Sequence, residues 1–238
     1  MELIEVSNGI VKGLIPKGDF QSELINLFLE DYPIFNKYID PEKDILDIGG
    51  CFGLMSLFFS EKTNKVVHVF EPLLSNFNIL EINTKNIKNI VLHNFGIGNE
   101  KEQSETFNIY SIKNNLGGSQ LYQKGIDPEL DKVVKKGMLK MKVDKLPLTI
   151  RSLDNLNLDI GECGFIKLDV EGFELPALLG ARKFIKKHNP NIFIEVHSWN
   201  MNDIEYNYKK EVFNVFKELN YKLDYTFSNQ NEFIFIPQ

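Results

Sequence analysis

The segment from Asp44 to Glu71 constrains the fold of this chain more than any other. It reads as an apolar strand, a glycine-containing turn, a short apolar helix and a second apolar strand that ends in the acid Glu71. Glycines in such a turn let backbone N–H groups approach an anionic ligand closely, at a helix N-terminus that favours negative charge. A carboxylate at the end of the second strand can accept hydrogen bonds from both hydroxyls of a ribose. The segment therefore predicts a binding site for a nucleoside-bearing cofactor.

Length and composition are typical of one globular α/β domain. The chain has 238 residues, of which 43% are hydrophobic, and this is enough to fill a sizeable core. Its net charge of −6 argues against a nucleic-acid surface, and its longest apolar stretch, around 54–59, is far shorter than a membrane span. Residues 1–12 contain two acids and no long apolar run, so we expect no secretory signal. Cys51 and Cys163 lack the spacing of a metal site, which favours a reduced, cytoplasmic protein.

Strand and helix patterns alternate along much of the chain. The expected strands cover 45–48, 66–70, 90–94, 165–170 and 191–196. The expected helices cover 54–60, 75–83, 175–187 and 209–220. This alternation predicts a mostly parallel sheet with helices on both faces, and such sheets bind ligands outside the carboxyl ends of their strands.

Two regions depart from this alternation. Residues 1–18 look like short strands or loops, helical spacing follows from position 24, and we predict an N-terminal helical extension over 1–40. Residues 98–150 have β character near both ends, with a Gly- and Lys-rich stretch that includes 114–119 between them. A segment of this length is typical of a functional lid or a mobile loop, so we predict an inserted β and loop segment there.

The end of the chain separates two similar folds. Residues 221–227 and 232–236 look like a closing antiparallel hairpin. A parallel sheet that finishes in an antiparallel pair fits methyltransferases better than the all-parallel dinucleotide fold. The glycine turn agrees, because D-x-G-x-x-x-G at 47–53 lacks the G-x-G-x-x-G frame of NAD-binding turns.

Three sequence blocks resemble those of the FkbM-family S-adenosylmethionine-dependent methyltransferases. They are I-L-D-I-G-G-C-F-G at 45–53, V-F-E-P at 69–72 and F-I-K-L-D-V-E-G-F-E at 165–174, and the resemblance covers about residues 40–198. It implies an enzyme that transfers a methyl group from S-adenosylmethionine to a hydroxyl of a small molecule or glycan, most often a sugar. The family often has Ala-Asn where this chain has Gly50-Cys51, so the side-chain contacts of that Asn do not carry over.

The residues and the resemblance together predict one class I methyltransferase (Rossmann-like) domain over the whole chain. Its α/β fold would have a mostly parallel seven-stranded sheet with an antiparallel last strand and helices on both faces. The glycines of the turn would hold the methionyl end of the cofactor, with Asp47 positioning its ammonium, and Glu71 would bind the ribose. Asn94 and Phe95 would flank the adenine, although Phe95 suits the core as well. The residues expected at the cofactor are Asp47, Gly49, Gly50, Cys51, Gly53, Glu71, Pro72, Asn94, Phe95 and Asp169.

An alcohol is a poor nucleophile while it keeps its proton, so a base or a metal ion is expected near the methyl group. Asp169, at the end of the fourth strand, is the first candidate for contacting both cofactor and acceptor. Glu171 follows in the turn, where it would orient the acceptor or cap the next helix. His197 lies just past the fifth strand, where a base at neutral pH and a structural histidine are both consistent with its position.

A metal site and an ion pair are further possibilities among these candidates and the residues beside them. Asp169, Glu195 and His197 could together bind a divalent cation that lowers the pKa of the acceptor, although no spacing in the chain demands one. Lys167 alternates onto the same face as Asp169, where an unpaired ammonium would be costly. We therefore predict an ion pair between Lys167 and Glu195 on the neighbouring strand.

Other functions remain as alternatives. The chain could be a non-catalytic subunit that binds S-adenosylmethionine, or an NAD-dependent oxidoreductase. Amino-methylating nucleic-acid enzymes carry an Asn/Asp-Pro-Pro-aromatic turn after the fourth strand, where this chain has D-V-E-G at 169–172, and we set that function aside. The expected partner is a small-molecule or sugar acceptor, with no nucleic acid and no membrane, and the oligomeric state is open.

Overall fold

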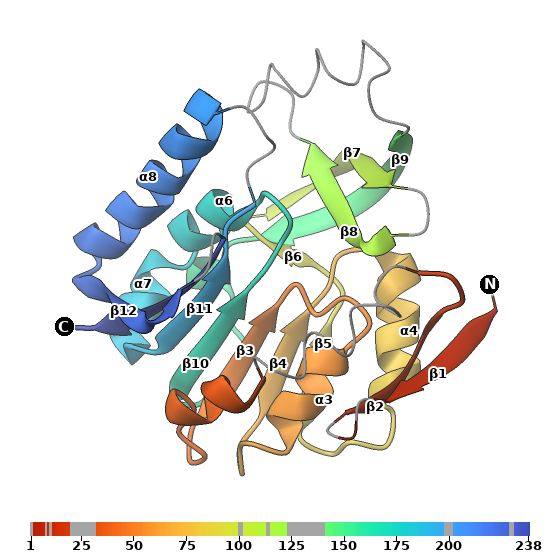
Figure 1. Ribbon diagram of the computed structural model, residues 1–238, viewed down its shortest axis with the longest axis horizontal. Helices are drawn as coiled ribbons and strands as arrows, with labels where there is room; N and C mark the ends of the chain where they lie inside the picture. Colours follow the sequence, from red (N-terminus) through yellow and green to blue (C-terminus); the bar gives the residue numbers. More distant parts are fainter. Residues whose placement is uncertain are drawn as a thin grey trace.

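A seven-stranded sheet forms the centre of the protein (Figure 1). The computed structural model describes residues 2–7, 9, 11–19, 32–99, 102–112, 115–122, 141–197, 202–228 and 231–238. Along the sheet the strands follow the order β12-β13-β11-β10-β3-β4-β5. They are β3 (Asp44–Ile48), β4 (Val67–Phe70), β5 (Ile90–His93), β10 (Cys163–Leu168), β11 (Asn191–Glu195), β12 (Tyr221–Ser228) and β13 (Glu232–Pro237).

The strand directions confirm the expected fold class. Neighbouring strands from β11 to β5 are parallel, whereas β13 is antiparallel to both β11 and β12. The chain runs outward from β3 to β5 on one side and then returns through β10 and β11 on the other. The crevice between β3 and β10 is therefore the topological switch point, where sheets of this kind bind their ligands.

Helices cover both faces of the sheet because its strands are apolar on both sides. Ile45 and Phe165 pack on one face with α3 and α4, while Leu46 and Ile166 pack on the other with α6, α7 and α8 (Figure 1). The helices are α3 (Leu54–Ser60), α4 (Leu74–Thr84), α6 (Glu174–Leu179), α7 (Arg182–His188) and α8 (Asn202–Glu218). Among the described residues, none of the helices combines the length and the apolar character that crossing a membrane requires.

The structure has two helices, α6 and α7, where the sequence predicts one over 175–187. The break lies at Gly180, where an added Cβ would come within 1.7 Å of the carbonyl oxygen of Gly98. Asp154, in the short 3-10 helix η2 (Leu153–Asn155), then accepts hydrogen bonds from the backbone N–H groups of Lys183 and Phe184 at 2.9 and 2.8 Å. A side chain distant in sequence thus binds the first backbone N–H groups of α7, and the local helical pattern does not reveal this contact.

The described part of 1–40 contains the short strands expected over 1–18, and its only helix is a 3-10 helix rather than an α-helical extension. Strands β1 (Leu3–Ser7) and β2 (Lys12–Pro16) form an antiparallel hairpin, and η1 (Tyr32–Lys37) is a 3-10 helix. The hairpin is docked on α4, because the side chain of Asn83 hydrogen-bonds both the N–H and the C=O of Leu14, at 2.7 and 2.9 Å. The helical spacing that follows position 24 lies outside the described residues up to position 31.

A second sheet lies beyond the carboxyl ends of β3 and β4 (Figure 1). In the order β6-β9-β7-β8, it contains β6 (Gly96–Ile97), β9 (Met141–Arg151), β7 (Glu102–Ile112) and β8 (Asn115–Tyr122). Strand β8 lies in the Gly- and Lys-rich stretch, where the sequence pattern shows no strand signal. Phe107 and Ile150 of this sheet are buried against Leu73 and Phe173, which follow β4 and β10. The described part of 98–150 therefore shares a small core with the segments that follow β4 and β10, at the ligand end of the main sheet.

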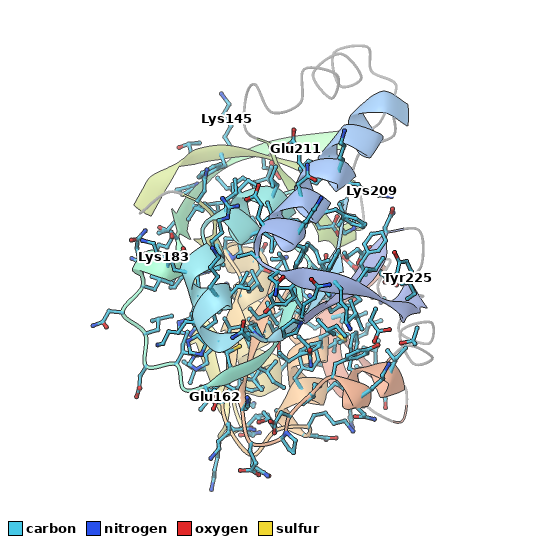
Figure 2. All side chains as sticks on the ribbon, turned by 90° about the vertical axis from the view of Figure 1, so that its left-hand side faces the viewer. Lys145, Glu162, Lys183, Lys209, Glu211 and Tyr225 are labelled. Atoms are coloured by element: carbon cyan, nitrogen blue, oxygen red, sulfur yellow. The ribbon has the colours of Figure 1, made fainter. Side chains whose placement is uncertain are left out.

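Figure 2 shows the direction of the main sheet from a second side. Lys145, on β9, lies at one end of the molecule, and Glu162, just before β10, lies at the other. The second sheet is thus at the opposite end from the amino ends of the central strands, and the carboxyl ends face it.

Candidate active site

The turn after β3 is shaped by residues in the left-handed backbone region. Gly49, Cys51 and Gly53 have φ angles of 90°, 49° and 83°. A Cβ added at Gly49 would lie 1.8 Å from the carbonyl oxygen of Asp169, so only glycine fits where this turn meets the end of β10. The predicted cofactor turn and the predicted catalytic residue Asp169 are therefore in direct backbone contact.

Glu71 lies beside this turn because β3 and β4 are in parallel register, with Ile48 opposite Phe70. Its carboxylate is buried and accepts hydrogen bonds from the backbone N–H groups of Cys51 at 2.9 Å and Leu73 at 2.8 Å. Burial raises the pKa of Glu71 to about 7, against the effect of these two hydrogen bonds, which favour the ionised form. Each carboxylate oxygen offers two lone pairs, so both can accept a further hydrogen bond from a ligand hydroxyl.

The two residues predicted to flank the adenine have different surroundings. Asn94 is exposed, and its side-chain amide donates to the carbonyl oxygens of Glu71 at 2.9 Å and Pro72 at 3.4 Å. Phe95 is 8% exposed, and its ring packs edge-on against that of Phe70. Phe95 thus belongs to the core, the second of the two roles that its sequence allows.

Asp47 is fully buried beneath the turn. One of its oxygens accepts a hydrogen bond from the hydroxyl of Ser56 on α3 at 2.6 Å, and the other lies 3.3 Å from the ammonium of Lys167. In this structure Asp47 connects the strand before the turn to Ser56 of α3 and to Lys167 of β10.

The predicted ion pair between Lys167 and Glu195 is wrong. The register places Lys167 opposite Asp47 on β3 and opposite Phe193 on β11, so Glu195 lies two residues further along its strand. The ammonium of Lys167 instead lies 3.3 Å from Asp169 and 3.3 Å from Asp47. Burial lowers the pKa of Lys167, but the charges of Asp169 and Asp47 outweigh this effect and raise it above its ordinary value. Lys167 therefore stays charged.

Four carboxylates surround the imidazole of His197. Its Nε2 lies 3.0 Å from Glu195 and 3.5 Å from Glu171. Its Nδ1 lies 3.4 Å from Glu174 and 3.9 Å from Asp169. Burial alone would lower the pKa of His197, but the hydrogen bonds and charges of these acids raise it to about 12. The imidazole therefore carries its proton at neutral pH, which favours a role as a cation over a role as a base.

The turn that carries Glu171 is held by hydrogen bonds to Glu174, a residue that sequence reasoning missed. Glu171 and Gly172 have positive φ angles of 51° and 95°. The buried carboxylate of Glu174 accepts hydrogen bonds from the N–H of Gly172 at 2.8 Å and from the hydroxyl of Tyr208, on α8, at 3.0 Å. The N-cap of α6 is Phe173, so Glu171 does not cap that helix. Burial raises the pKa of Glu171 to about 8.

The three residues predicted as possible metal ligands do lie together. Asp169, Glu195 and His197 each offer one ligand atom, and these atoms lie within 4.8 Å of one another. The two carboxylates suit Mg²⁺ or Mn²⁺, whereas the imidazole nitrogen suits a transition metal. A cation would have to displace the proton of His197, because a metal binds the neutral ring. The imidazolium itself already neutralises part of the acidic charge.

These features define a class I methyltransferase: the strand order, the glycine turn at the switch point, and acids at the ends of β4 and β10. A family model of the methyltransferase FkbM domain matches residues 47–223. The chain therefore belongs to the FkbM methyltransferase family and is an S-adenosylmethionine-dependent methyltransferase.

Solved structures include similar proteins at low sequence identity. Methyltransferase FkbM from Methylobacillus flagellatus KT has a TM-score of 0.49 and 18% identity, and the match covers 83% of this chain and 44% of that one. The matched part of this chain thus spans less than half the length of the Methylobacillus protein. A methyltransferase from Streptococcus mutans, solved in complex with S-adenosylhomocysteine (SAH), has a TM-score of 0.47 and 14% identity. The match covers 87% of this chain and 94% of that one. A search of curated proteins gives no match.

Proposed function

We propose that this protein transfers the methyl group of S-adenosylmethionine to a hydroxyl oxygen of a small molecule or glycan, with a sugar as the first candidate. The observation that carries the proposal is the contact between Asp169 and the glycine turn, where an added Cβ at Gly49 would lie 1.8 Å from the Asp169 carbonyl oxygen. An acid so placed can reach a hydroxyl aligned with the methyl group, and alignment supplies much of the rate of an in-line displacement.

The cofactor would bind over the carboxyl ends of β3 and β4. The backbone of the turn, at Gly49, Gly50, Cys51 and Gly53, would surround the methionyl end, and Glu71 would accept hydrogen bonds from the ribose hydroxyls. The cofactor supplies an electrophilic methyl on a sulfonium when bound. Its single positive charge there suits the excess of acids over cations around the site.

The acceptor hydroxyl must lose its proton during transfer. We assign Asp169 to accept this proton and Glu171 to orient the acceptor, because both side chains face the site around His197. His197, as an imidazolium, would hold these acids in place. The acceptor would also contact the second sheet, which lies at the same end of the molecule (Figure 1).

The remaining expectations about partners follow from charge and composition. A net charge of −6 disfavours nucleic acid as the acceptor. Both cysteines are free, which suits the cytoplasm.

The test has two stages. First, isothermal titration calorimetry and thermal shift should detect binding of S-adenosylhomocysteine but not of NAD⁺, since a bound ligand raises apparent stability. Second, a screen of sugars and other hydroxylated acceptors should release S-adenosylhomocysteine from S-adenosylmethionine. Binding of NAD⁺ alone would favour an oxidoreductase. Binding of S-adenosylhomocysteine without turnover on any acceptor would favour a non-catalytic subunit.

A further inference from the structure

The ammonium of Lys167 connects three groups of the active site. Its Nζ donates a hydrogen bond to the carbonyl oxygen of Gly49 at 2.9 Å, and it lies 3.3 Å from both Asp47 and Asp169. The side chain is 7% exposed, so these contacts are shielded from water. We propose that Lys167 is a positioning residue, which fixes the cofactor turn and Asp169, the proposed general base, relative to each other. The inference rests on the proposed function, because it assigns a role within that site.

The three acceptors match the chemistry of an ammonium group. Lysine has three N–H donors and no acceptor, and here it has three oxygen partners. They come from two strands, because Asp47 lies in β3 and the turn follows that strand, whereas Asp169 follows β10. Backbone pairing of Leu168 with Ile48 aligns the two strand ends, and the ammonium then joins their polar groups. One cation therefore links the turn that would hold the cofactor to the acid that would face the acceptor.

Lys167 also determines which oxygen of Asp169 is offered to a ligand. The Oδ2 atom is engaged by Lys167, while Oδ1 is buried and makes no hydrogen bond with any part of the chain that the structure describes. The Nδ1 atom of His197 lies 3.9 Å from Oδ1, beyond hydrogen-bond distance. Pairing of Oδ2 with Lys167 thus leaves Oδ1 as the oxygen of Asp169 with unused hydrogen-bonding capacity.

A simpler role would be neutralisation of the buried Asp47 alone. The two roles differ in their consequences. If Lys167 only compensates Asp47, removing both charges together should restore a normal protein. If Lys167 positions the site, removing both charges should restore stability, but the turn and Asp169 would lose the ammonium that binds both of them. The affinity for the cofactor should then fall.

The experiment compares Asp47→Asn with the double variant Asp47→Asn/Lys167→Met. Thermal unfolding reports stability, and calorimetry with S-adenosylhomocysteine reports the affinity of the cofactor site. We expect both variants to unfold within a few degrees of each other. The double variant should bind S-adenosylhomocysteine at least tenfold more weakly than Asp47→Asn, and equal affinity would overturn the proposal.

Two further variants keep the test decisive. Lys167→Arg retains the charge, so it remains informative if the double variant does not fold. A planar guanidinium cannot reproduce three contacts made by a compact ammonium, so we expect at least tenfold weaker binding. Affinity equal to that of the unmodified protein would overturn the proposal. Lys43→Met is the matched control, because Lys43 pairs with Glu162 at the opposite ends of β3 and β10 and should not affect binding.

The outcome separates this inference from the proposed function. If the unmodified protein does not bind S-adenosylhomocysteine, the proposed function fails before any variant is compared. If the unmodified protein binds it, and the Lys167 variants bind it equally well, only the positioning role fails.

Discussion

The carboxylate of Glu71 accepts a hydrogen bond from the backbone N–H of Cys51, with 2.9 Å between oxygen and nitrogen. This bond joins the end of β4 to the turn after β3, so the acid predicted to bind ribose also helps to shape the turn predicted to bind the methionyl end. Loss of the carboxylate should therefore affect both halves of the cofactor site.

Glu71→Ala should weaken binding of S-adenosylhomocysteine by about 10- to 100-fold, since hydrogen bonds to a charged group contribute about 1.5–3 kcal/mol. The fold should be retained. Calorimetry measures the affinity, and circular dichroism checks the fold. Glu81→Ala, which removes an exposed acid of α4, is the control. Unchanged affinity in Glu71→Ala would show that the ribose lies elsewhere.

Cofactor affinity should also increase with pH around neutrality. The pKa of Glu71 is raised from 4.5 to about 7 in the folded protein, and the ionised carboxylate is the better acceptor for ribose hydroxyls. Below pH 7 the affinity should fall by up to about tenfold per pH unit. Glu71 itself makes the free protein less stable as pH rises from 4.5 to 7, because its folded state binds the proton more tightly. Titrations from pH 6 to 8 should show a much flatter dependence in Glu71→Gln.

Asp169→Asn should reduce turnover much more than cofactor affinity. Loss of a general base costs about 10²- to 10⁴-fold in rate, whereas the backbone contact with Gly49 is unchanged by this substitution. The measurement compares kcat, on an acceptor found in the screen, with the affinity for S-adenosylhomocysteine. An equal loss in both quantities would instead make Asp169 a cofactor ligand alone.

The imidazolium of His197 should stabilise the fold in a pH-dependent way. Its pKa is raised from 6.5 to about 12, so its contribution is complete below pH 6.5 and is lost as pH rises toward 12. We expect the free energy of unfolding to decline between pH 7 and 9, by up to about 1.4 kcal/mol per pH unit from this group. His197→Gln should be less stable at pH 7 and should show a smaller decline. A difference in the free energy of unfolding between the two proteins that stays the same at every pH would contradict this assignment.

Methyl transfer should continue after removal of divalent cations. The protonated His197 lies among Asp169, Glu195 and the neighbouring acids, so a cation would have to compete with its proton. Dialysis against EDTA followed by an assay of S-adenosylhomocysteine release measures the effect. Activity lost on dialysis and restored by Mg²⁺ or Mn²⁺ would place a metal ion at these three residues.

Much of the fold is predictable because its signals are local. Helix α3 coincides with the predicted range of 54–60, and the strands of the main sheet lie within a few residues of their expected bounds. The failures have identifiable causes. Strand β8 contains Gly117 and Gly118, which suggest a turn, yet pairing with β7 makes it a strand. The break between α6 and α7 depends on Gly98, which is distant in sequence.

The candidate site shows the same division. Asp169, Glu171, Glu195 and His197 do converge, since parallel strands bring their carboxyl ends to one edge of the sheet. The partner of Lys167 was predicted wrongly, because face alternation does not give the register between strands. Glu174 and Tyr208 were missed. Glu174 lies inside a conspicuous sequence block, but no local pattern marks Tyr208.

By itself, the sequence determined the order of the strands and helices, the glycine turn and the acids at the strand ends. These depend on the period of apolar residues and on backbone preferences, which are local properties. Only the tertiary structure decided that Lys167 joins Asp47 to Asp169 and that His197 stays protonated. Ion pairing and pKa depend on register, burial and the distance between charges that are far apart along the chain.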